Sequence, residues 1–260
     1  MTFFGEDVKI LVFFLSVTFA LSSYANDVQK VYRADMARPE AVKADHGFLP
    51  RGMDGSRPNQ PPPNINLFDH VRGAATGMSR HDSGYVSTTS SRGVAINWVR
   101  DHLNNNGYVY HIDPTSNFID VNATLLSYTP HREELEFAAL GIIHWSQIIG
   151  WESVDSRGIG VYTPNPDYNG ELYSMVNAAG AVPELAGFPA GHPAWEREPW
   201  LQFANCGSGL RLPCQPVKTA QQVGVKWFKK SQKEIRRQAF RLLSAALIIE
   251  SRASVKKDEL

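Results

Sequence analysis

Glu133-Glu134-Leu135-Glu136-Phe137-Ala138-Ala139-Leu140 sets an acidic trio directly against an apolar run. If Glu134 to Glu136 is extended, the two-residue period of a strand places both carboxylates on one face, opposite Leu135. Like charges so close repel, and the repulsion raises the pKa of one of them. That cost is tolerated more readily at a functional site than in a scaffold, although an acidic trio in a surface turn is also common. The stretch is therefore the best candidate for chemistry.

Three further stretches embed polar residues in strand-like sequence: Val31–Asp35, Phe68–Gly73 and Gly84–Thr89. An arginine that holds phosphate, a hydroxyl that orients a carboxylate and a glutamate that stabilises positive charge form a set suited to NAD cleavage. Each residue also has a plain structural interpretation when taken singly. A structural ion pair would account for Arg33, a hydrogen-bonded core position for His70, and an ordinary strand hydroxyl for Ser87. Walker, H-E-x-x-H, G-x-S-x-G and paired C-x-x-C motifs are missing from the sequence.

Length and charge restrict the class of protein. The 260 residues, 43% of them hydrophobic, predict one main domain with a smaller appendage. Lys plus Arg and Asp plus Glu both total 26, so no overall field attracts nucleic acid or an anionic membrane. Strand composition is present at Asn64–Phe68 and Gly107–Ile112, and the proline-rich stretch 57–63 predicts an exposed loop.

The two ends of the chain carry export and retrieval signals. The apolar run Ile10–Leu21 is too short to span a bilayer and, with small residues before Asn26, predicts a signal peptide over residues 1–25. An oxidising compartment favours a disulfide between Cys206 and Cys214 over two free thiols, and such a bond would contribute roughly 2–3 kcal/mol. The chain ends Lys257-Asp258-Glu259-Leu260, the address read by the endoplasmic-reticulum retrieval receptor.

The segment after Pro216 has helical periodicity. A broad apolar stripe includes Ile235, Ala239, Leu242, Ala246 and Ile249. A basic band precedes and overlaps this stripe: Lys226, Lys229, Lys230, Lys233, Arg236 and Arg237. Because the helix lies at the very end of the chain, we favour an intermolecular partner over packing on its own domain.

Many ordered motifs together resemble the A subunits of the cholera toxin and heat-labile enterotoxin family. The match runs through Tyr32–Asp35, Asn64–Leu67 with Asp69-His70, Arg80–Asp82 with Gly84–Thr88, Glu134-x-Glu136, Ser146–Ile148 with Gly150-Trp151, Leu185–Pro189, Glu198–Trp200, the cysteine pair, Gly224–Lys226 and the terminal signal. The resemblance implies an α+β ADP-ribosyltransferase fold whose strands frame an NAD cleft. A disulfide-closed loop and a long C-terminal helix should follow.

The resemblance also implies roles for single residues. The NAD-binding residues would be Arg33, Asp35, Arg51 and His70. Ser87 would hold Glu136, which stabilises the oxocarbenium-like ribose, while Glu134 would prepare the acceptor guanidinium. No metal is required.

The same resemblance implies the partners and the domain limits. A catalytic domain over 26–211 would be nicked after Arg211, and residues 212–260 would dock into a homopentameric B subunit. The substrate would be an arginine of a host stimulatory G-protein α subunit, whose modification raises cyclic AMP. A host ADP-ribosylation factor GTPase would act as activator.

Two alternatives remain open from the sequence. A resident endoplasmic-reticulum binding or folding protein would also carry the export signal, the disulfide and the terminal address. An NAD glycohydrolase would share the cleft but use water as the acceptor.

Overall fold

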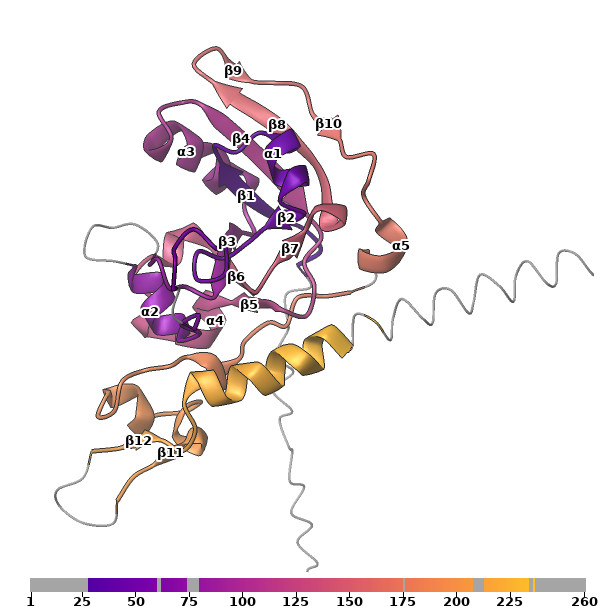
Figure 1. Ribbon diagram of the computed structural model, residues 1–260. Coiled ribbons are helices and arrows are strands. Elements are labelled where there is room, and N and C mark those ends of the chain that lie inside the picture. Colours follow the sequence, from indigo (N-terminus) through magenta and orange to yellow (C-terminus); the bar gives the residue numbers. More distant parts are fainter. Residues whose placement is uncertain are drawn as a thin grey trace, which may run out of the picture.

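The computed structural model describes residues 28–59, 62–73, 80–174, 176–207, 213–233 and 236 (Figure 1). Their framework is an antiparallel sheet of eight strands, in which β9 pairs with β8 and the others follow the order β10-β8-β4-β1-β3-β6-β5. The strands are β1 (Val31–Asp35), β3 (Tyr85–Thr89), β4 (Gly107–Ile112), β5 (Phe118–Asp120), β6 (Glu136–Leu140), β8 (Ile148–Asp155), β9 (Gly158–Ile159) and β10 (Thr163–Pro164).

Short helices and two small ribbons surround this sheet. The α-helices are α1 (Pro39–Ala44), α2 (Leu67–Arg72), α3 (Arg92–His102), α4 (Val121–Leu125) and α5 (Gly170–Tyr173), together with a helix over 220–233 that carries no label in Figure 1. Short 3₁₀ turns connect several of these elements. The ribbons are β2 (Gly47–Phe48) with β7 (Ile143–His144), and β11 (Ala204–Asn205) with β12 (Gln215–Pro216). The predicted α+β class is confirmed, and the strand predicted at Gly107–Ile112 is β4 with the same bounds.

Apolar side chains divide the core into three clusters. One packs α3 against β1, β4 and β8, and includes Val99, Val109 and Val154. A second lies around Val31 and Tyr110. The third joins β3, β5 and β6 to residues 182–200, where Trp195 and Trp200 are almost fully buried. The site described below lies where β3 and β6 meet α2.

The strand predicted at Asn64–Phe68 is wrong. Only Asn64 makes an isolated bridge, to Ser83, and α2 begins at Leu67. A distant segment decides this outcome, because Phe68 N–H donates to Ala186 O at 2.8 Å. Gly187 has a φ of +67°, and a side-chain carbon there would lie 2.6 Å from Asn66. Both the left-handed backbone and the close approach favour glycine at this position.

The C-terminal part of the described chain packs on the main domain (Figure 1). Cys206 and Cys214 form the predicted disulfide, flanked by β11 and β12. The helix over 220–233 approaches the core at Gly224, where a side-chain carbon would lie 2.3 Å from Ile65. The described helix over 220–233 therefore packs on the chain's own domain. The predicted apolar stripe from Ile235, the predicted nick residue Arg211, the predicted signal peptide and the terminal Lys257–Leu260 lie outside the described residues.

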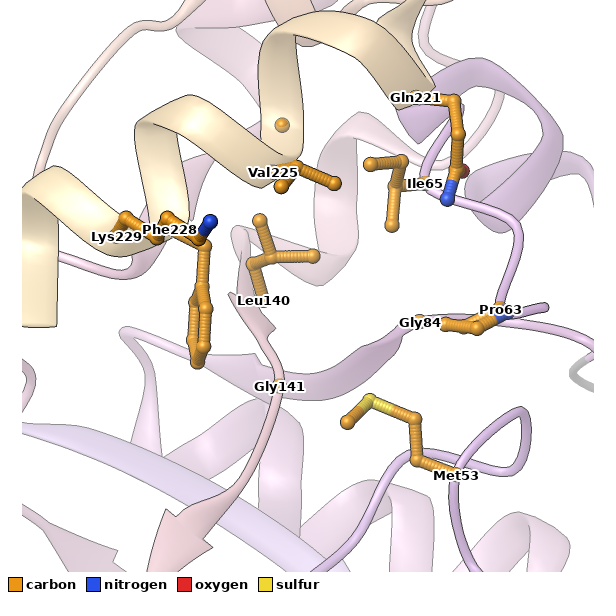
Figure 2. A pocket seen from close by; sticks show the side chains of 11 residues that line it. Met53, Pro63, Ile65, Gly84, Leu140, Gly141, Gln221, Val225, Phe228 and Lys229 are labelled. Carbon is orange, nitrogen blue, oxygen red and sulfur yellow. The ribbon is translucent and has the colours of Figure 1, made fainter.

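An apolar pocket of about 170 Å³ lies between this helix and the sheet (Figure 2). Val225 and Phe228 of the helix face Leu140 at the end of β6, and Met53 closes the opposite side. The pocket is at the Tyr85–Leu140 end of the β3–β6 ladder, whereas Glu136 is at the other end. Its apolar lining does not suit a phosphate-bearing ligand. Within the described ranges there is also no helix with the length and apolarity that a bilayer span needs.

Candidate active site

The sheet register gathers the predicted strand residues. Thr89 pairs with Tyr32 of β1 and with Glu136 of β6. Ser87 is two residues before Thr89, so its side chain shares a sheet face with Glu136. The ladder between β1 and β3 has only this one register pair within the described residues, and α2 supplies His70 beside it.

The buried His70 and Glu136 and the partly buried Ser87 form a hydrogen-bonded cluster. His70 Nε2 lies 3.0 Å from Glu136 Oε1, and Ser87 Oγ lies 3.2 Å from the same nitrogen. The Ser87 hydroxyl also acts to lower the pKa of the Glu136 carboxylate. His70 and Glu136 are only 7% and 8% exposed. The structure thus brings together the three residues that the sequence placed in separate stretches.

The pKa of Glu136 reflects opposing effects. Burial is the largest and acts to raise it, while the charge and hydrogen bond of His70 and the hydrogen bond from Ser87 act to lower it. The net result is a pKa below the ordinary value of 4.5. Glu136 is therefore a carboxylate at neutral pH although it is almost enclosed, and a fixed negative charge in such a place acts strongly on a nearby cation.

The extended conformation expected for Glu134–Glu136 is wrong. Arg132–Glu134 forms a 3₁₀ turn, Leu135 is left-handed with a φ of +48°, and β6 begins at Glu136. Leu135 O accepts a hydrogen bond from Ser90 N–H at 3.1 Å, which ties the turn to the end of β3. Tertiary contacts thus support a backbone conformation that leucine rarely adopts.

Glu134 differs from Glu136 in its electrostatics. It is half-buried, and burial, followed by repulsion from Glu136, raises its pKa above the ordinary 4.5. The predicted rise in the pKa of one of the two glutamates is confirmed, with burial as the larger cause. The two carboxyl groups therefore have pKa values displaced in opposite directions, which is a common property of paired groups with different catalytic roles.

Arg33 on β1 is held from three sides. Its Nη1 donates to Ser87 O at 2.9 Å, its Nη2 pairs with Asp35 at 2.6 Å, and its guanidinium lies over the Phe48 ring. Its buried Nε has no hydrogen-bond partner among the described residues. The guanidinium is thus oriented and retains N–H donors for an anion.

Arg51, also predicted to bind NAD, lies in a turn before β3. It is exposed and precedes Gly52, whose N–H donates to Ser83 O at 2.7 Å.

The sequence did not single out Ser83. It is buried, and its Oγ lies 2.8 Å from His70 Nδ1. No local motif marks it, because the contact depends on how α2 meets the start of β3. Among the described residues, no three His, Cys, Asp or Glu side chains are grouped to hold a metal ion. The cluster can stabilise a cation at Glu136 and accept a proton at Glu134.

Comparisons with known proteins identify relatives of this chain. The family model described as heat-labile enterotoxin alpha chain matches residues 7–259. The A chain of heat-labile enterotoxin IIB from Escherichia coli is 42% identical over 204 residues, which cover 75% of this chain and 76% of that protein. The A chain of cholera enterotoxin from Vibrio cholerae is 39% identical over 246 residues, covering 90% and 93%. The NAD(+)–arginine ADP-ribosyltransferase Chelt from Vibrio cholerae is 37% identical over 79% of this chain and 35% of its own length.

Solved structures show the same likeness. An Escherichia coli heat-labile enterotoxin with one buried substitution matches with a TM-score of 0.59 and 39% identity, over 69% of this chain and 100% of that one. A double mutant of heat-labile enterotoxin matches with a TM-score of 0.63 and 34% identity, over 81% and 94%.

Proposed function

The chain belongs to the heat-labile enterotoxin alpha-chain family, and from this membership we propose that it splits NAD and transfers ADP-ribose to an arginine of a host protein. One observation carries the proposal: Glu136 is an enclosed carboxylate, held by His70 and Ser87, with the higher-pKa Glu134 close to it in sequence. The relative Chelt is itself named an NAD(+)–arginine ADP-ribosyltransferase.

The residues around the cluster suit NAD as a substrate. Arg33, oriented by Asp35 and Phe48, would bind the pyrophosphate with its remaining N–H groups. His70 would line the site beside the nicotinamide ribose, and Arg51 would contribute charge from the exposed turn. No metal takes part in this scheme.

The reaction would proceed through a ribose cation. The bond between the ribose and nicotinamide breaks with its electron pair leaving on nicotinamide, and positive charge develops on the ribose. The Glu136 carboxylate stabilises that charge, and His70 and Ser87 fix its position in advance. A nitrogen of the acceptor guanidinium then attacks the ribose carbon, and its proton passes to Glu134. The raised pKa of Glu134 makes it a better base than an ordinary glutamate.

Membership of the family supports more specific proposals for the acceptor, the activator and the domain limits. The acceptor would be an arginine of a host stimulatory G-protein α subunit, whose modification raises cyclic AMP, and a host ADP-ribosylation factor GTPase would activate the enzyme. Residues 26–211 would form the catalytic domain. Residues 212–260 would dock into a homopentameric B subunit, and the final four would direct retrograde passage through the endoplasmic reticulum after secretion.

One assay separates the competing functions. The mature chain is incubated with labelled NAD and agmatine, an arginine analogue, and free nicotinamide and ADP-ribosyl-agmatine are quantified. Adduct formation supports the transferase. Nicotinamide release without adduct would indicate an NAD glycohydrolase, and no release would favour a binding protein of the endoplasmic reticulum.

The domain proposal has its own test. After trypsin nicks the chain following Arg211, mass spectrometry without reductant should show one covalent species, because Cys206 and Cys214 are bonded across the cut. Separation into two fragments without reductant would contradict it.

A further inference from the structure

Burial and hydrogen bonds fix the position of the Ser83 side chain. It is 2% exposed, and its Oγ accepts a hydrogen bond from Tyr85 N–H at 3.2 Å while lying 2.8 Å from His70 Nδ1. Its backbone is fixed on both sides, because Ser83 N–H donates to Arg80 O and Ser83 O accepts from Gly52 N–H. The hydroxyl therefore faces the His70 ring from a rigid support.

The two ring nitrogens of His70 have different partners: Nε2 lies near Glu136 Oε1 and Ser87 Oγ, whereas Nδ1 lies near Ser83 Oγ. A carboxylate can only accept hydrogen bonds, so the 3.0 Å contact with Glu136 requires a hydrogen on His70 Nε2. In the neutral ring, Nδ1 then carries a lone pair and needs a donor. In the charged ring, Nδ1 carries a hydrogen and needs an acceptor. A serine hydroxyl can do both, by rotating its hydrogen.

We propose that Ser83 is a positioning residue that keeps the His70 ring turned with Nε2–H toward Glu136, in both the neutral and the charged ring. Ser83 acts through His70 and does not touch NAD. Its catalytic consequence rests on the proposed function, in which Glu136 must be held at a fixed position beside the ribose. Without the hydroxyl, Nδ1 loses its partner and the ring can tilt or turn over, which releases one of the two groups that hold Glu136.

The first test needs no substrate. In the full mature chain labelled with ¹⁵N-histidine, the two nitrogens of each ring are followed by NMR as pH is varied. We expect the Nε2–H signal of His70 to persist across the pH range, with the hydrogen of the neutral ring on Nε2. A neutral His70 with its hydrogen on Nδ1 would overturn the proposal.

The second test uses three variants. Ser83→Ala removes the hydroxyl, and Ser83→Thr restores it. Thr124→Val is the matched control, because Thr124 is also fully buried and its hydroxyl accepts from a backbone N–H, that of Val182 at 3.0 Å, away from His70. We expect Ser83→Ala to weaken or broaden the Nε2–H signal. It should lower kcat for NAD hydrolysis about tenfold, the effect of one hydrogen bond, with KM nearly unchanged.

The outcomes separate this proposal from the proposed function. Unchanged kcat and an unchanged Nε2–H signal in Ser83→Ala would overturn the positioning role, as would an equal loss of kcat in Thr124→Val. Recovery in Ser83→Thr would support it. If the wild-type chain released no nicotinamide but showed the expected NMR signals, the proposed function would fail while the placement of His70 by Ser83 stood.

Discussion

Two buried histidine–glutamate pairs lie on one face of the sheet. Cross-strand register aligns His111 with Tyr32, Tyr32 with Thr89 and Thr89 with Glu136. The first pair, His70 with Glu136, is joined at 3.0 Å. The second pair, His111 with Glu152, is separated by 3.6 Å, and Arg92 of α3 donates to Glu152 from both Nε and Nη2, at 2.9 and 2.6 Å.

The two pairs differ in the groups that compensate the negative charge of each carboxylate. Glu152 is neutralised by a guanidinium, and His111 Nε2 is left without a hydrogen-bond partner among the described residues. Glu136 is held by His70 and Ser87, and forms no ion pair with Arg or Lys in the part of the chain that the structure describes. A carboxylate that is held but not neutralised can act on a substrate cation, whereas one locked to arginine mainly supports the fold.

The largest expected effect is that of Glu136→Gln, which keeps the side-chain shape and removes the charge. Nicotinamide release and transfer to agmatine should both fall by about 10²–10³, because both reactions pass through the ribose cation. Glu152→Gln is the matched control on the same face and should leave both rates, per folded molecule, close to wild type. Equal losses of activity in the two variants would show that Glu136 is no more important for catalysis than Glu152.

Stability, unlike activity, should decrease in Glu152→Gln. Glu152→Gln leaves the Arg92 charge without its partner and should lower the free energy of unfolding by about 1–2 kcal/mol. The loss is limited because the Arg92 side chain is 40% exposed and water screens its charge. Urea unfolding followed by circular dichroism measures the change. An unchanged midpoint would mean that the ion pair contributes nothing to stability.

Acidification should change the products before it stops the reaction. Glu134 must be ionised to take the acceptor proton, and its pKa lies above 4.5, whereas that of Glu136 lies below it. As pH falls, Glu134 is protonated first, so the ratio of agmatine adduct to free ADP-ribose should decrease while nicotinamide release continues. Parallel measurement of both products across the acid range checks this order. A constant ratio would contradict it.

The smallest effect concerns His111. Burial lowers its pKa below the ordinary 6.5, against an opposing effect of Glu152 and with smaller contributions from Lys30 and Arg92. The unfolded chain therefore takes up a proton here before the folded chain does, and the free energy of unfolding falls as pH decreases from about 6.5. His111→Phe should reduce that slope. The slope should not vanish, because His144 and His192 also have lowered pKa values.

The sequence predicted much of this site, and its errors come from contacts between residues that are far apart in the chain. Arg33, His70, Ser87 and Glu136 lie in short stretches that match a family pattern. The strand-like interpretation of Phe68–Gly73, which carries His70, is wrong, because α2 covers Leu67–Arg72. The backbone of Leu135 was misjudged because its left-handed conformation depends on Ser90, 45 residues away. Ser83 was missed for a related reason: its contact with His70 exists only once α2 packs beside β3.

The sequence did not predict the contact between His111 and Glu152, for a different reason. His111 and Glu152 stand on different strands, and only the register of β4 with β8 brings them together. A single sequence shows which residues alternate along a strand, but it does not fix which strand lies beside which.

The most direct test of the whole account is the product ratio of Glu134→Gln. The variant is first shown to be folded by circular dichroism, then incubated with NAD and agmatine, and free nicotinamide and ADP-ribosyl-agmatine are measured in the same sample. We predict that adduct formation is strongly suppressed while much of the nicotinamide release persists, because water can replace the acceptor without Glu134. Nicotinamide release abolished as completely as in Glu136→Gln, or adduct formation at the wild-type level, would contradict the division of roles between the two glutamates.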